Sequence, residues 1–195
     1  GLGDVYKRQE YARSHYHLSK ADLFSLFMEQ SSALCKENKF YAHINMQSWM
    51  FLSSFEDTRK YVIDEQAIVC LSHLGSGVFD EISGEVVQAC MFSILNHKEP
   101  MYRGVYQNLR NNNGGSVNDI KKATYYTPKQ NNFRSIAGMP IAFWAGDDIF
   151  SLFKENPSIG DVGVARQGLS TSDNDRFLSL IHISEPTRHA QMSYA

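Results

Sequence analysis

Three apolar stretches limit what this chain can fold into: Phe40–Met46, Ala67–Leu71 and Glu85–Leu95. They are rich in β-branched and aromatic residues and have the length of strands. Glu85–Leu95 lacks strict alternation of apolar and polar residues, which is typical of a strand covered on both faces. The sequence therefore predicts a buried sheet. The loops that follow its strands are where an open α/β sheet usually binds ligands.

Helical patterns surround these strands. Apolar or small residues recur at helical intervals from about Lys20 to Lys36, and Ser54–Asp64 predicts a second helix between the first two strands. Further along, Val117–Ala123 and Asp147–Phe153 predict short helices, and Pro140–Trp144 predicts a strand or extended segment. No helix is expected between the second and third strands. This order predicts an α/β fold with a mostly parallel sheet whose final pair is antiparallel.

The two ends of the chain share a coding signature that folding cannot explain. Gly1–Gln9 and Leu178–Pro186 can be encoded by one DNA string read in opposite directions. That string is identified as the adapter of transposon-based sequencing libraries. We therefore expect residues 1–9 and 178–195 to be adapter-derived, and they are left out of the fold prediction. The insert, residues 10–177, is expected to lack native sequence on both sides.

The composition, with 43% hydrophobic and 21% charged residues, is typical of a soluble globular domain. No apolar run approaches the ~20 residues of a membrane helix, so no membrane partner is expected. Cys35, Cys70 and Cys90 lie in apolar settings without metal or redox spacing. They predict small core residues in a reduced compartment, the cytoplasm.

Positive charge is concentrated in one segment. Residues 101–136 contain six basic residues against Asp119 alone, whereas the segments on either side are net negative. Aromatic and amide side chains alternate with these cations, a composition that suits nucleic-acid binding. A solvated linker with a few packed tyrosines has the same composition, so both interpretations stay open. The candidate DNA contacts in this segment are Arg103, Arg110, Lys121, Lys122, Lys129 and Arg134.

The chain shows little sign of its own catalytic machinery. Neither common phosphate-binding glycine loop is present. His43 and His73 predict packed or hydrogen-bonded side chains, so no catalytic triad and no metal site is assigned. Trp49 and Phe79 follow the first two strands, at the expected functional edge. For Trp49, a place in the core and a place beside the site are both open.

Five spaced motifs resemble one family. In chain order they are Ser19–Glu29, Ile44–Glu56, His73–Phe79, Gly84–Gln88 and Gly168–Phe177. Together they are similar to the adenine-specific DNA methyltransferases of the BREX phage-defence type (PglX-like), relatives of the type II restriction–modification methyltransferases. The resemblance covers nearly all of residues 10–177.

This resemblance implies the C-terminal half of a class I, Rossmann-like methyltransferase sheet. The implied reaction moves a methyl group from S-adenosylmethionine to the exocyclic amino group of adenine in double-stranded DNA. The base must first leave the duplex stack, because its amino group is otherwise paired. The catalytic Asn-Pro-Pro-Tyr/Phe loop and the main cofactor-binding loop are expected upstream of Glu10, so no catalytic residue is assigned here. Phe79 is implied to stack on the extruded base, with a core position as the alternative, and Asp22 to lie beside the cofactor, with helix capping as the alternative.

The resemblance also implies a domain organisation. Residues 10–97 correspond to the C-terminal half of the catalytic domain, and residues 98–177 to a linker and the start of a DNA target-recognition region. Ser172 stands where the family usually has Gly, which weakens the prediction of a turn with positive φ there. Arg176 joins the candidate DNA contacts, with a purely structural role in the turn as the alternative.

The expected function is site-specific adenine methylation in phage defence or restriction–modification, with other defence-system proteins as candidate partners. The longer parent protein is expected to be active and this chain inactive. Two rivals stay open: part of a fused restriction endonuclease–methyltransferase, and a non-catalytic DNA-binding specificity protein. An intact Asn-Pro-Pro-aromatic loop upstream would indicate an enzyme, and a degraded loop would indicate the binding protein.

Overall fold

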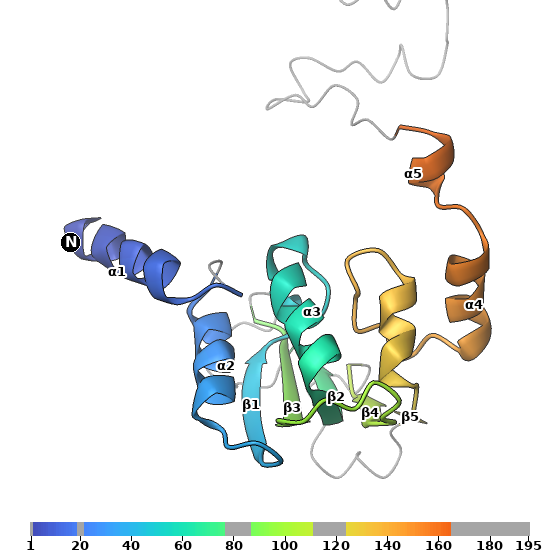
Figure 1. Ribbon diagram of the computed structural model, residues 1–195, viewed down its shortest axis with the longest axis horizontal. Helices are drawn as coiled ribbons and strands as arrows, with labels where there is room; N and C mark the ends of the chain where they lie inside the picture. Colours follow the sequence, from blue (N-terminus) through green and yellow to red (C-terminus); the bar gives the residue numbers. More distant parts are fainter. Residues whose placement is uncertain (1, 19–21, 77–86, 111–123, 165–195) are drawn as a thin grey trace, which may run out of the picture. The chain divides into compact units, whose positions relative to one another are not determined.

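The computed structural model describes residues 2–18, 22–76, 87–110 and 124–164 (Figure 1). The chain divides into two compact units, Gly1–Asn156 and Pro157–Ala195. In the second unit, helix α5 (Ile159–Val162) begins with a capping box formed by Ser158 and Asp161. Some of the predicted features lie outside the described residues: Phe79, Lys121, Lys122, Arg176 and the helix at 117–123.

The first unit combines helices with one sheet. Its helices are α1 (Leu2–His15), α2 (Leu23–Leu34), α3 (Glu56–Glu65) and α4 (Asp147–Glu155), with the 3-10 turns η1 (Gln47–Met50), η2 (Ser53–Phe55) and η4 (Gln130–Ser135). Its strands are β1 (Phe40–Met46), β2 (Ala67–Gly75), β3 (Ala89–Leu95), β4 (Val105–Asn108) and β5 (Thr124–Tyr126).

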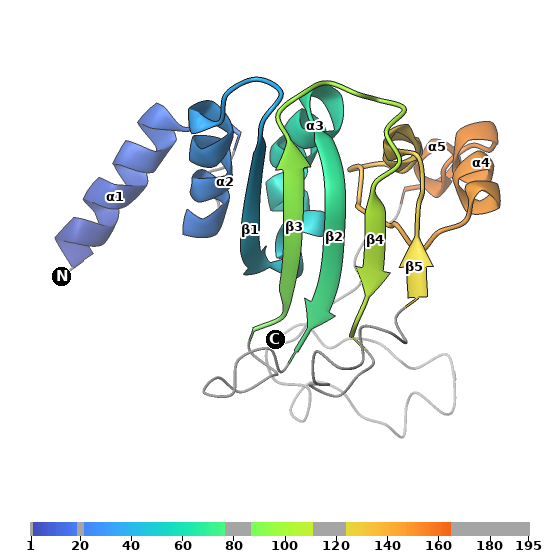
Figure 2. The same ribbon diagram turned by 90° about the horizontal axis from the view of Figure 1, so that it is seen from below.

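The described strands form one sheet in the order β1-β3-β2-β4-β5. Strand β3 lies between β1 and β2 and runs antiparallel to both, whereas β2 and β4 are parallel and β5 is antiparallel to β4. Strands β1, β2 and β4 therefore point toward the same edge (Figure 2). The predicted antiparallel pair of the second and third strands is confirmed, but the prediction of a mostly parallel sheet is wrong: among the described strands only β2 and β4 pair in parallel, because β3 inserts between β1 and β2.

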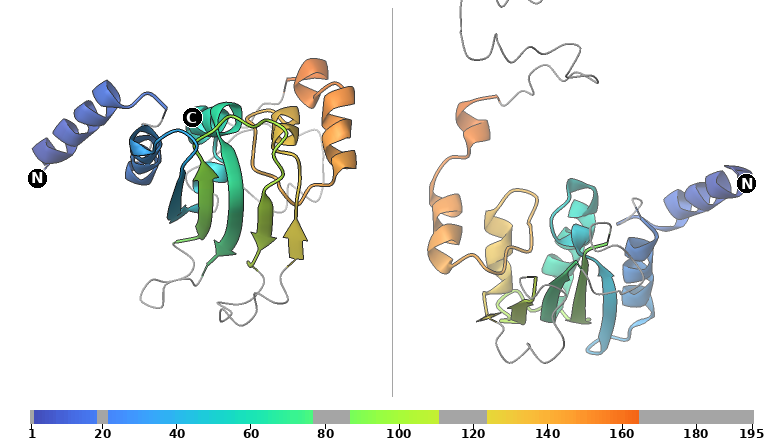
Figure 3. Two further views of the ribbon diagram at one scale, coloured as in Figure 1. Left: turned by 60° about the horizontal axis from the view of Figure 1, so that its bottom comes forward. Right: turned by 180° about the vertical axis from the view of Figure 1, so that it is seen from behind.

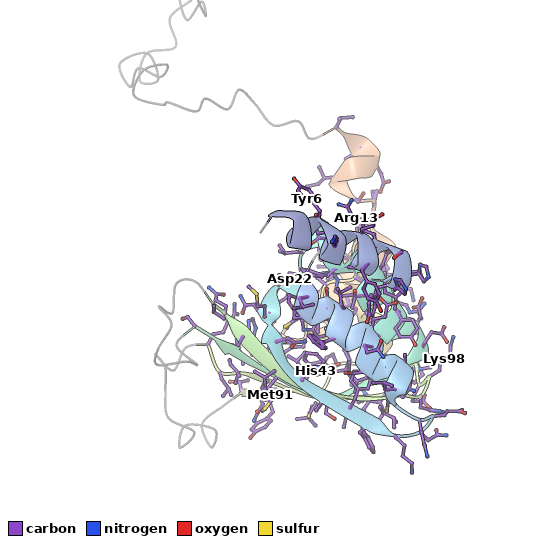
Figure 4. All side chains as sticks on the ribbon, turned by 90° about the vertical axis from the view of Figure 1, so that its left-hand side faces the viewer. Tyr6, Arg13, Asp22, His43, Met91 and Lys98 are labelled. Carbon is purple, nitrogen blue, oxygen red and sulfur yellow. The ribbon has the colours of Figure 1, made fainter. Side chains whose placement is uncertain are left out.

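Helices cover one face of this sheet. Both α2 and α3 lie on that face, as Figures 1 and 3 show. The core between them and the sheet contains Ile63 from α3, Phe92 from β3, and Phe143 from the segment before α4. Figure 4 shows His43 on the covered side and Met91 on the other. Met91 is 45% exposed. The prediction that the third strand is covered on both faces is therefore wrong for this chain, because no described element packs on the Met91 side.

Several predicted details need correction. Strand β2 runs to Gly75 rather than ending at Leu71, because the residues from Cys70 to His73 pair with β4. The extended segment at 140–144 is not a strand. Of the cysteines, only Cys90 lies in the core; Cys70 is exposed on the uncovered face and Cys35 is half-buried.

The sheet continues past residue 97. Strands β4 and β5 and turn η4 come from residues 98–156, and they belong to the same compact unit as β1 to β3. Within the described ranges, no helix is both long enough and apolar enough to cross a membrane.

Candidate functional site

The parallel strands end along one side of the sheet, which we call the carboxyl edge. Strands β1, β2 and β4 end there at Met46, Gly75 and Asn108, and the antiparallel strand β3 begins there at Ala89 (Figure 2). Ligands of open α/β sheets usually bind at this edge, outside the carboxyl ends of the strands. The side chains at the carboxyl edge therefore form the candidate site.

A chain of amide and imidazole groups ties three elements together at this edge. His73 Nε2 donates a hydrogen bond to Gln47 Oε1, and Gln47 Nε2 donates to Gln88 Oε1. The backbone N–H of Gln47 also donates to the Gln88 carbonyl, with an N···O distance of 2.9 Å. The side chains therefore hold η1, β2 and the start of β3 in fixed register.

The imidazole of His73 is fully buried between the rings of Phe51 and Phe143. Burial lowers its pKa to about 4, with a smaller contribution from the positive charge of Arg110. The ring is therefore neutral at pH 7, which confirms the prediction of a packed, hydrogen-bonded histidine.

An exposed cation–aromatic pair lies at the same edge. Arg110 follows β4, and its guanidinium carbon is 5.6 Å from the ring centre of Trp144. Its Nε donates to Asn108 Oδ1 at 3.2 Å. Trp144 also packs against Phe51, with ring centres 5.7 Å apart, and stays 40% exposed. Sequence reasoning selected Arg110 by charge but missed Trp144, whose position beside Arg110 depends on the tertiary fold.

Sequence reasoning also missed a buried arginine that supports the carboxyl edge. Arg59 of α3 is only 1% exposed. It donates to the carbonyls of Trp49, Leu52 and Gly138 at N···O distances between 2.6 and 2.9 Å. Since these carbonyls come from η1, the turn after it and the loop before Ile141, Arg59 joins three segments that border the site. The one available signal was its position on the apolar face of α3, beside Val62 and Ile63.

Trp49 and Asp22 occupy very different environments. The Trp49 ring is fully buried against Phe92, and its Nε1 donates to Cys90 Sγ at 3.2 Å. Asp22 is exposed at the start of α2, and its side chain makes no capping hydrogen bond. Figure 4 shows it toward the opposite end of α2 from Lys98, on the side of the carboxyl edge.

The candidate DNA contacts are split between the two edges of the sheet. Arg110 lies at the carboxyl edge, whereas Arg103 and Lys129 pair across β4 and β5 at the opposite edge. There, Arg103 Nη1 donates to the Thr127 carbonyl at 2.8 Å, and Arg134 forms an ion pair with Asp64. Of the described candidates, Lys129 and Arg134 line one pocket at this opposite edge and Arg103 is bridged to Lys129, so only Arg110 lies apart from them at the carboxyl edge. The described part of the chain contains no group of three or more metal-ligating side chains.

Comparison with known proteins identifies relatives. Residues 3–79 match the family described as Eco57I restriction-modification methylase. The adenine-specific methyltransferase BrxX of Escherichia coli O9:H4 (strain HS) is 38% identical over 179 residues, which cover 87% of this chain and 14% of that protein. The adenine-specific methyltransferase PglX of Lacticaseibacillus casei (strain Zhang) is 33% identical over 183 residues, which cover 89% of this chain and 15% of that protein.

The chain is similar to one segment of these adenine-specific methyltransferases. It spans about one seventh of the length of these relatives. The resemblance inferred from the five sequence motifs is therefore confirmed.

Proposed function

We propose that this chain is part of an adenine-specific DNA methyltransferase that acts in phage defence or restriction–modification. The observation that carries the proposal is the 38% identity to BrxX over 87% of the chain. The family match over residues 3–79 supports the same chemistry and gives weight to the restriction–modification alternative, a fused endonuclease–methyltransferase. Double-stranded DNA is the proposed substrate, and other defence-system proteins are proposed partners of the parent.

The proposed place of the chain is the C-terminal half of a class I methyltransferase sheet. Supporting this, β1 and β2 run in the same direction with α3 between them in sequence, and β3 inserts antiparallel between the two strands. Among the described strands, β1 has a neighbour on one side only. The upstream strand that precedes the catalytic loop would pair with its free side. Residues 10–97 would then complete the catalytic domain, and residues 98–177 would begin the recognition region.

S-adenosylmethionine is the proposed methyl donor, but the described residues do not fit a complete site for it. The carboxyl edge supplies the buried Gln47–His73 pair and the exposed Asp22 and Arg110. Among these residues there is no glycine-rich turn that could bring backbone close to the cofactor. We therefore assign the main cofactor loop to the sequence upstream of Glu10. Asp22 is proposed to border the site, because its exposed carboxylate is not used for capping.

Phe79 is proposed to stack on the adenine after the base leaves the duplex. Its support is its position in the chain, four residues after Gly75, where β2 ends at the carboxyl edge. An aromatic face suits any extruded base and contributes about 1–3 kcal/mol. The described residues would then form a rigid support for the site, because the Gln47–His73 pair holds the strand ends in register. The catalytic loop of the parent would bind the amino group of the adenine.

The parent coding sequence provides the test. Extending the sequence upstream should show an Asn-Pro-Pro-aromatic loop just before Glu10. The purified parent should then transfer tritiated methyl groups from S-adenosylmethionine to adenine in DNA, whereas a variant with that Asn replaced by Ala should not. The 195-residue chain alone should show no transfer. A degraded loop with retained DNA binding would favour the non-catalytic specificity protein, and a nuclease motif further upstream would favour the fused enzyme.

A further inference from the structure

Arg110 is an exposed cation at the carboxyl edge. Among the described residues it forms no ion pair, whereas Arg134 at the opposite edge is paired with Asp64. A guanidinium group has a planar set of donors that matches phosphate and carboxylate oxygens. Its position at the ligand-binding side of the sheet therefore suits an anionic ligand.

The guanidinium of Arg110 is held in place before any ligand arrives. Asn108 Oδ1 accepts hydrogen bonds from both its Nε and its backbone N–H, at 3.2 and 3.3 Å. The ring of Trp144 supports it from the side, 5.6 Å from the guanidinium carbon. A cation fixed in this way loses little side-chain entropy on binding, which strengthens each contact that it makes.

Gly75 provides the space that Arg110 occupies. Its φ of +75° favours glycine, and a Cβ at this position would lie 2.9 Å from Arg110 Cγ and 3.2 Å from Arg110 Cα. Any other residue would have to displace the arginine or the end of β2. The Gly75–Arg110 contact therefore couples the end of β2 to the position of the guanidinium.

We propose that Arg110, packed on Gly75 and supported by Trp144, binds a backbone phosphate of the DNA strand at the carboxyl edge. This inference rests on the proposed function, since it takes DNA as the ligand. Phosphate is favoured because the exposed part of Trp144 offers an aromatic surface to a sugar or base next to the cation. The positive excess of residues 101–136 would further attract a polyanion.

Salt-dependent DNA binding by the purified chain tests this proposal. Fluorescence anisotropy with a labelled duplex, measured over a series of salt concentrations, gives the slope of log K against log salt. Arg110→Gln should weaken binding about 10-fold and reduce the slope by about 1, the effect of losing one phosphate contact. Lys98→Gln removes one positive charge at the opposite edge, where Lys98 pairs with Glu65 and is not a candidate DNA contact, and it should leave the slope unchanged. Gly75→Ala keeps the charge but displaces Arg110, so it should reduce the slope as Arg110→Gln does.

Intrinsic fluorescence provides a second measurement. The chain has two tryptophans, and Trp49 is buried, so a DNA-dependent change in emission should come from Trp144 and disappear in Trp144→Phe. Circular dichroism and thermal melting check that each variant is folded. If Gly75→Ala is unfolded, the comparison of Arg110→Gln with Lys98→Gln decides.

Three results would overturn the proposal: no binding by the wild-type chain at low salt, equal slopes for Arg110→Gln and Lys98→Gln, or wild-type binding by a folded Gly75→Ala variant. Methylation by the parent is measured separately. If the parent methylates DNA but Arg110→Gln keeps the wild-type slope, only the proposed phosphate contact is refuted. If the parent does not methylate DNA but Arg110→Gln reduces the slope as expected, the methyltransferase function is refuted and the phosphate contact is supported.

Discussion

At the residue scale, the buried imidazole of His73 makes the stability of the fold dependent on pH. Its folded pKa of about 4 lies below the ordinary value of 6.5. Between these values the unfolded chain binds more protons than the folded chain, so stability is complete above about pH 6.5 and falls as the pH drops. The expected loss is about 3 kcal/mol by pH 4. Urea unfolding at pH 7 and pH 4.5 measures the difference.

His73→Gln is the matched control, because an amide can keep a hydrogen bond to Gln47 without titrating in this range. The pKa of His43 is also lowered by burial, so a smaller pH dependence should remain in this variant. If His73→Gln and the wild-type chain lose the same stability between the two pH values, His73 is not the cause.

A second residue-scale prediction concerns Phe79 in the parent enzyme. Phe79→Ala should lower kcat/KM about 10- to 100-fold, because it removes the aromatic face that supports the extruded base. Phe79→Tyr keeps that face and should be nearly as active as the wild type. A duplex with 2-aminopurine at the target adenine reports extrusion through its fluorescence. Equal activity of the Ala and Tyr variants would refute the stacking role.

Single residues also show where the sequence stops being informative. The sequence shows that the loop after β1 contains aromatic residues. Whether Trp49 is buried, however, depends on Phe92 and Cys90, which contact it only in the folded chain. The role of Arg59 was not visible, because an arginine among apolar residues usually extends to solvent and here turns to backbone carbonyls instead.

At the element scale, local periodicity was enough where an element has a strong pattern of its own. Strand β1 has the predicted bounds Phe40–Met46, and α3 differs from the predicted helix by at most two residues at either end. Strands β4 and β5 have four and three residues and no recognisable pattern. Strand β4 forms because β2 offers it a pairing partner, and β5 because β4 does; such non-local pairing leaves little signal in a short sequence.

The element-scale prediction is that Arg59 holds α3 to the segments beside the carboxyl edge. Arg59→Met keeps most of the side-chain volume but leaves the carbonyls of Trp49, Leu52 and Gly138 buried without their donor. We expect a loss of about 3 kcal/mol or more in the free energy of unfolding, measured with urea. Lys60→Met is the control: Lys60 is exposed and makes a surface ion pair with Asp64, so its loss should cost less than about 1 kcal/mol. Similar losses in the two variants would contradict the role of Arg59.

At the scale of the whole molecule, one face of the sheet exposes apolar side chains that no described element covers. Phe40, Ile44 and Met46 of β1 are exposed, and so is Met91 of β3. A sheet with antiparallel pairings, like this one, can leave one face to solvent, but that face then normally carries polar side chains.

Because this apolar sheet face is exposed, we expect the isolated chain to self-associate. The outer side of β1 can pair with another strand, and the apolar face beside it can pack against a second copy. Light scattering after size exclusion should therefore show oligomers that grow with protein concentration. Ile44 and Met91 are cross-strand partners, so the double variant Ile44→Lys/Met91→Lys should shift the chain toward monomer. Leu152→Lys, which removes an equally exposed apolar residue from α4, should not. A monomeric wild-type chain, or an equal shift with Leu152→Lys, would show that the open sheet face does not drive association.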